Sequence, residues 1–309
     1  MTMPLLMCLA GLVGLGLGGD WLVKGAVGIA RRAGMSNLLT GLVIVGFATS
    51  MPELVTSVEA ALAGSPGIAW GNIIGSNIAN ALLILGATAL VAPIILTGTG
   101  RRDAVVALLA SVLVWILAMQ GLASVWLGLG LLALTIVYIV WRYRYPRFEE
   151  GDDDEADGEA ELSVPRSLFW LAIGLAALVA GGQALVTGAI EIAGMAGISE
   201  TVIGLTVVAV GTSLPELAAS VAAAMRGKSA LAIGNVVGSN IYNLLVIGGV
   251  TLVISPRPIP LEMVDMELPV MAASALVILV MCWFGRRISR VGGALLLAAF
   301  AINTALLFA

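Results

Sequence analysis

The feature that most constrains this chain is an acidic motif that lies inside a long apolar run and occurs twice. Gly46–Glu53 reads Gly-Phe-Ala-Thr-Ser-Met-Pro-Glu, and 163 residues further on Gly211–Glu216 repeats its Thr-Ser-x-Pro-Glu core. The same offset maps Gly71–Asn80 onto Gly234–Asn243, and both read Gly-Asn-x-x-Gly-Ser-Asn-Ile-x-Asn. Polar segments at matching positions of two apolar halves are typical of membrane transporters built from internal repeats.

Long apolar runs make up most of the chain. Of its 309 residues, 60% are hydrophobic and 11% are charged, whereas charged residues make up about a quarter of a soluble domain. A helix needs about 20 mostly apolar residues to cross a bilayer. Runs of this length predict transmembrane helices near 4–31, 38–62, 70–95, 103–120, 123–143, 166–193, 200–226, 229–255, 266–285 and 291–308. We therefore expect an all-α membrane protein with ten transmembrane helices in the lipid bilayer.

The ten expected helices divide into two halves of five. We predict a first transmembrane repeat over 1–145, an acidic cytoplasmic linker over 146–165 and a second transmembrane repeat over 166–309. Because five is odd, the second half enters the membrane in the opposite orientation, which makes the halves inverted-topology repeats. The net charge of −4 comes mainly from Glu149–Glu161. This run favours a solvated linker over a regulatory cation site, and it gives no support to nucleic-acid binding.

The basic residues predict the orientation of the chain, because Lys and Arg collect on the cytoplasmic side of membrane proteins. With the helices above, one side of the membrane holds Arg31, Arg32, Arg101, Arg102, Arg142, Arg144, Arg147, Arg166, Arg226, Lys228, Arg286, Arg287 and Arg290. Arg257 falls on the other side, and Lys24 falls within the first helix. Both termini are therefore expected to be extracytoplasmic, in a multi-pass protein of the plasma (inner) membrane. No positive segment precedes the first apolar run, so we expect a retained helix rather than a cleaved signal.

The histidine, cysteine and glycine content of the chain excludes several kinds of functional site. The chain has no histidine, which excludes imidazole catalysis and His-containing metal sites. Cys8 and Cys282 are expected near opposite membrane faces, as unbridged apolar side chains. Gly14–Gly19 contains G-x-G-x-x-G, but it lies in an expected span that no strand precedes, so close helix packing is a better interpretation than dinucleotide binding. Asp20 and Lys24 lie four residues apart and could pair on one helix face.

Glu53 and Glu216 are expected near the middle of the bilayer, about fifteen residues into their helices at roughly 1.5 Å per residue. Ionisable groups at that depth are costly and usually bind or relay something; the structural alternative is a protonated glutamate that only packs. Pro52 and Pro215 should kink or break the helices, because proline lacks the backbone N–H group. The carbonyls freed near Ala48 and Gly211 are tolerated in lipid where they line a cavity.

Other oxygen-bearing side chains occur beside the two glutamates. Ser76 and Asn80 share one helix face, as do Ser239 and Asn243, because four residues separate the members of each pair. The candidate ion ligands are Glu53, Glu216, Thr49, Ser50, Thr212, Ser213, Ser76, Asn80, Ser239 and Asn243. Structural roles, either capping interrupted helices or bonding between helices, are expected for Asn72, Asn77, Asn235 and Asn240. An all-oxygen set suits Ca²⁺, Na⁺ or protons rather than zinc or copper.

The charges of such a site favour exchange over cotransport. One Ca²⁺ neutralises two ionised glutamates, and protons or Na⁺ can neutralise the same pair. Two ion sets would then compete for one site. If the empty, doubly negative site is too costly to carry through a low-dielectric barrier, only loaded states change access.

These motifs resemble the two alpha repeats of the sodium/calcium exchangers in the cation/calcium antiporter superfamily, prokaryotic type. The resemblance covers Gly18–Gly86 and Gly181–Gly249 without a significant gap, the ten-helix plan and the linker. It implies an electrogenic exchanger that drives Ca²⁺ out with Na⁺, with one site between four core helices. Sliding of the first and sixth helices would give alternating access. No enzyme activity, no resident cofactor and no obligate protein partner are expected.

The resemblance also implies roles for individual residues. Glu53 and Glu216 match the carboxylates that both Ca²⁺ and Na⁺ share. Four residues match the hydroxyl and carbonyl ligands of the family: Thr49, Ser50, Thr212 and Ser213. Three more match its flanking Na⁺ ligands: Ser76, Asn80 and Ser239. Asn243 departs from the pattern, because many of these exchangers carry Asp there; the departure affects Na⁺ coordination and any K⁺ cotransport.

Three other functions remain open at this point. A proton-coupled calcium or cation antiporter of the same architecture is the second interpretation, although its relatives usually show Gly-Asn-x-x-Glu at the first motif. An intramembrane hydrolase would need a metal or a nucleophile, and no histidine is available to help. The last alternative is an ion sensor that does not transport. A duplicated, symmetric cation site favours transport, because alternating access exploits inverted repeats.

Overall fold

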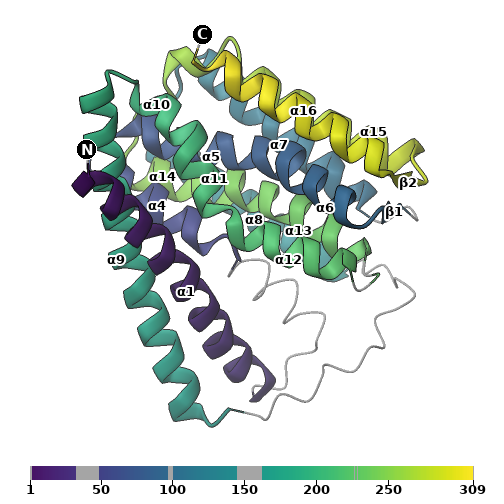
Figure 1. The fold of residues 1–309 in the computed structure, drawn as a ribbon, viewed down its shortest axis with the longest axis horizontal. Helices are drawn as coiled ribbons and strands as arrows, with labels where there is room; N and C mark the ends of the chain where they lie inside the picture. Colours follow the sequence, from purple (N-terminus) through teal and green to yellow (C-terminus); the bar gives the residue numbers. More distant parts are fainter. Residues whose placement is uncertain are drawn as a thin grey trace.

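A computed structural model describes residues 2–32, 49–96, 100–144, 162–225, 227 and 229–308. They are almost entirely helical (Figure 1). The α-helices are α1 (Thr2–Arg32), α4 (Met51–Leu62), α5 (Pro66–Ile78), α6 (Leu85–Val91), α7 (Arg101–Met119), α8 (Val125–Arg144), α9 (Val164–Ala196), α10 (Glu200–Ile203), α11 (Ala209–Thr212), α12 (Leu214–Met225), α13 (Ser229–Tyr242), α14 (Gly248–Ile254), α15 (Glu267–Phe284) and α16 (Arg290–Leu306).

At three places one α-helix continues directly into the next through a wider π-helical segment: between α5 and α6, between α10 and α11, and between α13 and α14. The π-helical segments are η2 (Ala79–Ile84), η3 (Gly204–Val208) and η4 (Asn243–Ile247), and one 3₁₀ turn forms η5 (Leu261–Met263). The expected helix near 70–95 begins earlier, at Pro66, and ends at Val91. Its predicted end was wrong, because Ile94–Ile95 (β1) instead pairs antiparallel with Arg287–Ile288 (β2).

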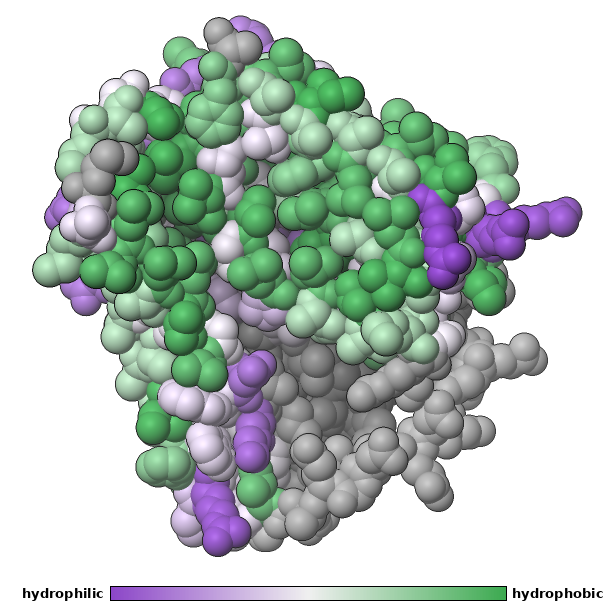
Figure 2. Space-filling model, in the orientation of Figure 1, coloured by the Kyte–Doolittle hydropathy of each residue, from purple (hydrophilic) through white to green (hydrophobic). Residues whose placement is uncertain are grey.

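The helices confirm a multi-pass, all-α membrane protein. In the described residues, seven helices are long and apolar enough to cross a membrane, or eight if the bent segment Glu200–Met225 counts as one. Apolar side chains cover most of the coloured part of the face drawn in Figure 2, and hydrophilic side chains lie at its edges and in its lower part. Large side chains such as Trp126 and Phe284 are 79% exposed, as expected where lipid rather than water surrounds a helix. Residues 38–48 of the expected helix 38–62 and most of the acidic linker lie outside the described residues, as do Arg147, Arg226 and Lys228.

The candidate motifs lie on the two most buried long segments. Pro66–Val91 and Ser229–Ile254 are 83% and 72% buried over their most apolar stretches, against at most 44% for the other candidate spans. They pack on each other in the larger apolar core, with side chains such as Ile74 and Val237 inaccessible. The first Gly-Asn-x-x-Gly-Ser-Asn motif is therefore buried throughout, and in the second motif Ser239 and Asn240 are buried whereas Gly234 is exposed.

Helices α1 and α9 lie side by side, and one end of the pair extends away from the other helices (Figure 1). Their contact is backbone to backbone: a Cβ added at Gly18 would lie 2.7 Å from the Leu178 amide nitrogen, and one at Gly181 would lie 2.8 Å from that of Leu15. Small residues allow this approach, which confirms the packing role predicted for Gly14–Gly19. The glycine-rich run is helical, so no strand precedes it.

Lys24 of α1 does not form the ion pair that was expected with Asp20. Lys24 Nζ lies 4.7 Å from the centre of the Trp170 ring, and among the described residues the ion pair found joins Asp103 to Arg142. The predicted pairing of Asp20 with Lys24 was therefore wrong, because the cation contacts an aromatic face instead.

The two halves are packed unequally despite their similar sequences. Helix α9 covers α4, where Met51 is 9% exposed and a Cβ at Gly182 would lie 2.8 Å from Val55 Cγ1. The equivalent face of α12 is open: Leu214, which is equivalent to Met51, is 50% exposed, and Ala218 is also exposed. Among the described residues, α9 thus covers α4 at the level of the motifs, whereas the equivalent face of α12 is exposed.

Candidate functional site

Both acidic motifs begin with an interruption of the helix. Ser50 and Ser213 have nearly identical, non-helical backbone angles, with φ/ψ of −87°/8° and −85°/6°. Each is followed by a proline in the first turn of the next helix, where the missing N–H group costs no hydrogen bond. The axis bends by 44° between Thr212 and Leu214, which confirms the break predicted at Pro215. Ala48, near which a freed carbonyl was predicted, lies outside the described residues.

The two carboxylates are held by serines from the opposite half. Ser213 Oγ donates a hydrogen bond of 2.9 Å to Glu53 Oε1, and Ser50 Oγ donates one of 3.3 Å to Glu216 Oε1. Both glutamates are completely buried, and they are close enough to interact electrostatically. The crossed bonds bring four of the predicted ligands together between α4 and α12.

Two asparagines fix the helices that carry the glutamates. Asn72 Nδ2 donates to the Glu53 carbonyl at 3.1 Å and to Ser57 Oγ at 2.9 Å. The same arrangement recurs 163 residues on, with distances of 3.3 and 3.0 Å, among Asn235, the Glu216 carbonyl and Ser220. The interhelical role predicted for Asn72 and Asn235 is therefore confirmed. These bonds link α4 to α5 and α12 to α13.

The threonines of the motifs occupy different positions. Thr212 is buried; its hydroxyl donates to Asn72 Oδ1 at 3.0 Å, and it also lies near the Glu53 carboxylate. Thr49 is half-buried and directly precedes Ser50, where the helix is interrupted. Thr212 thus connects the second acidic motif to the first asparagine, as a member of the same polar cluster.

The second pair of motifs meets across α5 and α13. Asn80 Nδ2 donates to Asn240 Oδ1 at 3.0 Å, and Asn240 Nδ2 donates to the Asn77 carbonyl at 3.3 Å. Ser76 Oγ contacts the Ala209 carbonyl at 3.4 Å. The π-helical segments η2 and η4 lie at Asn80 and Asn243, respectively. Such wide turns displace side chains from the regular helical register and are frequent at functional sites.

Several buried polar atoms of this cluster have no hydrogen-bond partner within the described residues. They are Glu53 Oε2, Glu216 Oε2, Asn77 Oδ1, Asn80 Oδ1, Ser239 Oγ and both amide atoms of Asn243. Burying a polar group without a partner costs free energy, and two adjacent buried carboxylates also repel each other. A hard cation would compensate both costs, because it takes carboxylate, amide and hydroxyl oxygens as ligands. The unpartnered oxygens therefore fit a cation as cargo.

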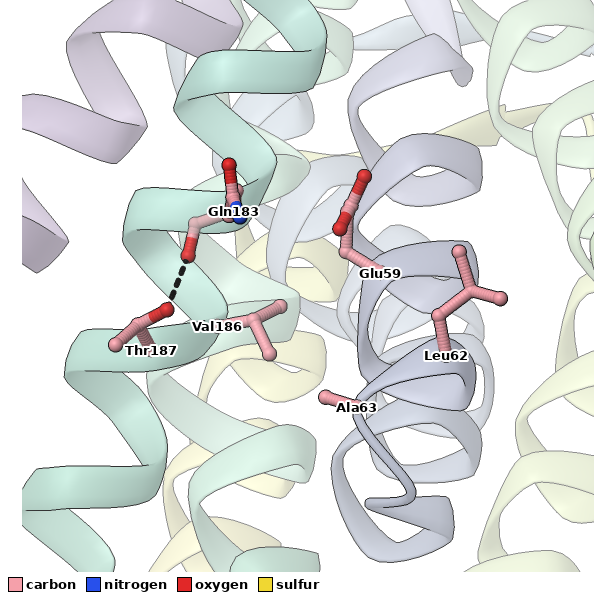
Figure 3. A pocket seen from close by; sticks show the side chains of 6 residues that line it. All are labelled: Glu59, Leu62, Ala63, Gln183, Val186 and Thr187. Atoms are coloured by element: carbon pink, nitrogen blue, oxygen red, sulfur yellow. Dashed lines mark hydrogen bonds between the residues drawn. The ribbon is translucent and has the colours of Figure 1, made fainter.

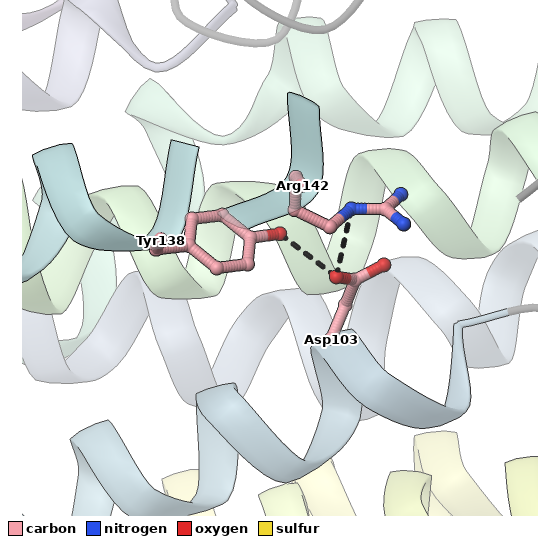
Figure 4. A network of polar contacts seen from close by, with 3 residues as sticks. All are labelled: Asp103, Tyr138 and Arg142. Carbon is pink, nitrogen blue, oxygen red and sulfur yellow. Dashed lines mark hydrogen bonds and ion pairs between the residues drawn. The ribbon is translucent and has the colours of Figure 1, made fainter. Parts of the chain in front are cut away.

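A contrasting carboxylate shows what a structural ion pair looks like in this molecule. Asp103 Oδ1 lies 3.2 Å from Arg142 Nε and accepts a hydrogen bond of 2.9 Å from the Tyr138 hydroxyl (Figure 4). This network joins α7 to α8, and its aspartate is already paired with a cation of the chain. Glu53 and Glu216 have no such partner among the described residues. The charges of these two buried carboxylates are therefore not balanced by a cationic side chain among the described residues.

The donor set is poor for a transition metal. In the described part of the chain, no three His, Cys, Asp or Glu side chains come together to hold a metal ion, and both Cys8 and Cys282 are free and buried. What converges instead is a pair of carboxylates with neutral oxygens around it. Such a set matches hard cations better than soft ones.

The sequence did not reveal every residue of the cluster. Ser57 and Ser220, which accept from the asparagines, were not selected, although they are equivalent by the 163-residue offset. Thr88 and Thr251 are likewise equivalent, and both are buried hydroxyls without a partner in the described residues. Both pairs follow from the 163-residue offset when it is applied to every polar residue of the chain.

Comparisons with known proteins agree with this geometry. The family described as "Sodium/calcium exchanger protein" matches residues 3–144 and 166–309. A putative antiporter, CaxA of Alkalimonas amylolytica, is 40% identical over all of this chain and 99% of its own. The sodium/calcium exchanger MaX1 of Methanosarcina acetivorans is 33% identical over 99% of both chains.

A solved structure extends the likeness to three dimensions. The sodium-calcium exchanger NCX_Mj, soaked with 2.5 mM Na⁺ and 10 mM Sr²⁺, superposes with a TM-score of 0.68 at 34% identity, over 98% of each chain. The family match, the long relatives and the superposition agree with the paired carboxylates and with the all-α membrane fold. The chain therefore belongs to the sodium/calcium exchanger family, a family of membrane antiporters of prokaryotic and other origin.

Proposed function

We propose that this chain is a secondary active antiporter that exchanges Na⁺ for Ca²⁺ by alternating access to a site between Glu53 and Glu216. The observation that carries the proposal is the pair of buried carboxylates, each held at Oε1 by a serine of the other half and unpartnered at Oε2 among the described residues. Two negative charges balance one Ca²⁺. Several Na⁺ ions could balance the same charges, so that the two loads exclude each other.

The other candidate ligands either hold the two carboxylates or supply oxygens to flanking Na⁺ ions in this proposal. Ser50 and Ser213 hold the carboxylates and offer hydroxyl oxygens; Thr212 lies near the Glu53 carboxylate, and Thr49 directly precedes Ser50 in the chain. Oxygens for flanking Na⁺ ions come from Ser76, Asn80, Ser239 and Asn243. Asn243 supplies a neutral amide, and both of its unpartnered atoms support a place for it in the ion site. No resident cofactor and no obligate protein partner form part of the proposal.

The proposed architecture has ten transmembrane helices as two inverted repeats, over 1–145 and 166–309, joined by a cytoplasmic linker. Both termini would face the extracytoplasmic side of the plasma membrane. Hydrogen bonds repeated at the 163-residue offset support the internal repeat. The two matched ranges of the family, which leave out 145–165, support the boundary between the halves.

Alternating access is supported by the unequal packing of the two halves. The face of α4 that carries Met51 is covered, whereas the equivalent face of α12, which carries Leu214, is exposed. If the halves exchanged these arrangements, α1 would close over α12 and α9 would leave α4. The glycine contact between α1 and α9 would allow the two helices to move as one body.

Proton coupling is the second candidate. Two adjacent buried carboxylates can be neutralised by protons as well as by metal ions, and the serine bonds of Glu53 and Glu216 do not distinguish the two. A proton-coupled calcium antiporter would use the same site and the same change of access.

The decisive experiment is uptake of radioactive Ca²⁺ into proteoliposomes. Vesicles loaded with Na⁺ are compared with vesicles loaded with K⁺ or choline, and with vesicles under an imposed pH gradient. Uptake that requires internal Na⁺ is expected. Uptake driven only by the pH gradient would instead identify a proton antiporter, and uptake under neither condition would refute the proposed function.

A further inference from the structure

A polar cleft lies between α4 and α9, away from the candidate ion site. Its volume is about 250 Å³, and it is lined by Glu59, Leu62, Ala63, Gln183, Val186 and Thr187 (Figure 3). Glu59 projects from α4 toward α9, and Gln183 faces it from α9. The Thr187 hydroxyl donates to the Gln183 carbonyl at 2.8 Å. We refer to this feature as the α4–α9 cleft.

The carboxylate of Glu59 has no compensating charge. No side chain in the described ranges donates a hydrogen bond to it or forms an ion pair with it, although it is only half-exposed. Asp103, by contrast, is paired with Arg142. An unpaired carboxylate in a partly apolar cleft attracts cations, because the surrounding walls screen its field less than bulk water does.

The cleft lies on the same helix as Glu53 but stops short of it. Six residues separate Glu59 from Glu53, which is about 9 Å along α4. One turn closer to Glu53, Gly182 of α9 packs against Val55 so closely that a Cβ would lie 2.8 Å from Val55 Cγ1. Separation of α9 from α4 at this contact would join the cleft to the candidate ion site.

We propose that Glu59 is a cation-attracting residue at the entrance to this site, on the side of the membrane where α4 ends. The inference rests on the proposed function and adds an entrance with its own charge. The equivalents of Glu59, Gln183 and Thr187 in the other halves are Ala222, Asp20 and Lys24. The cleft is therefore not duplicated with the same chemistry, and Glu59 acts on cations that arrive from one side only.

The charge of the ion sets the size of the effect. Over the roughly 8 Å of a cleft of this volume, Coulomb attraction in water concentrates a monovalent cation about twofold and a divalent cation about fivefold near a unit negative charge. The energy is proportional to the ionic charge, so the factor for Ca²⁺ is about the square of that for Na⁺. Salt weakens both factors by screening.

The test measures Ca²⁺ and Na⁺ dependence of exchange in right-side-out and inverted membrane vesicles. Glu59→Gln is expected to raise the Ca²⁺ concentration for half-maximal uptake about fivefold, and that of Na⁺ about twofold, from one side only and with an unchanged maximal rate. Gln183→Glu, which adds a carboxylate to the cleft, should lower both. Glu191→Gln is the control, because Glu191 is exposed on α9 and does not line the cleft.

The outcomes separate this inference from the proposed function. Equal shifts from both sides, a fall in the maximal rate alone, or no shift in either cleft variant would overturn the role of Glu59 while wild-type exchange persists. A shift of the same size in Glu191→Gln would also overturn it, because general surface charge would then explain the effect. Wild-type vesicles that exchange no Ca²⁺ with either gradient would refute the proposed function itself.

Discussion

Replacing Glu53 with glutamine removes one of two buried charges without changing the size of the side chain. In the ion-free protein, Glu53 and Glu216 are both inaccessible and repel each other. The variant is therefore expected to be at least as stable as the wild type when no ion is bound. With Ca²⁺ bound, however, one positive charge is left uncompensated, and an unpaired buried charge costs about 3–5 kcal/mol. Ca²⁺ affinity should fall by roughly two to three and a half orders of magnitude, since about 1.4 kcal/mol is tenfold.

Thermal unfolding of the purified protein in detergent measures this loss. At a Ca²⁺ concentration of about 100 times the dissociation constant, binding stabilises the wild type by about 2.7 kcal/mol. At the same concentration, Glu53→Gln should gain about 0.3 kcal/mol or less. In a chelator, both proteins should unfold at similar temperatures. Ca²⁺ uptake into proteoliposomes should fall with the affinity.

The control for this experiment is Glu267→Gln. Glu267 is a buried glutamate at the start of α15, outside the candidate ion site, so its loss should leave Ca²⁺ stabilisation intact. Wild-type Ca²⁺ dependence in Glu53→Gln would refute the assignment of the site. Unfolding of the variant in chelator at a much lower temperature would assign Glu53 a structural role instead.

Three further predictions test separate contacts. Ser213→Ala should lower the stability of the ion-free protein by about 0.5–1.5 kcal/mol, because a buried hydrogen bond is lost; Ser50→Ala, whose bond is 3.3 Å rather than 2.9 Å long, should lose less, and equal losses in denaturant titrations would contradict this order. Asn243→Asp should retain transport but change its ion selectivity or its pH dependence, and an unchanged pH profile and selectivity would place residue 243 outside the ion site. Gly181→Ala should cost about 1–3 kcal/mol through overpacking against α1, whereas Gly194→Ala on the same helix should not, because no atom lies within 4 Å of its added Cβ.

The repeat made much of the site predictable. Matching motifs 163 residues apart selected the glutamates, serines and asparagines that the structure brings together. Burial of these residues also followed, because a carboxylate in a long apolar run must lie inside a helix bundle. Ser50 and Ser213 have similar non-helical backbone angles, and each lies two residues before a proline.

What the sequence could not predict is the pairing between halves. Ser50 is three residues from Glu53, and a local bond is as reasonable from the sequence as the observed bond to Glu216. Asn72 was assigned correctly to a structural role, but its partners depend on the crossing of α4 and α5. The π-helical segments at Asn80 and Asn243 could not be predicted from the sequence either, because residue propensities do not distinguish a π turn from an α turn in an apolar helix.

The crossed bonds make the two halves dependent on each other. Each half supplies a carboxylate, but the hydroxyl that orients it comes from the other half. Neither half could assemble its own binding centre alone, however well it folded. If the chain were cut within 146–165, activity should return only when both pieces are made together, and a defect in one piece could not be repaired by a second copy of the other.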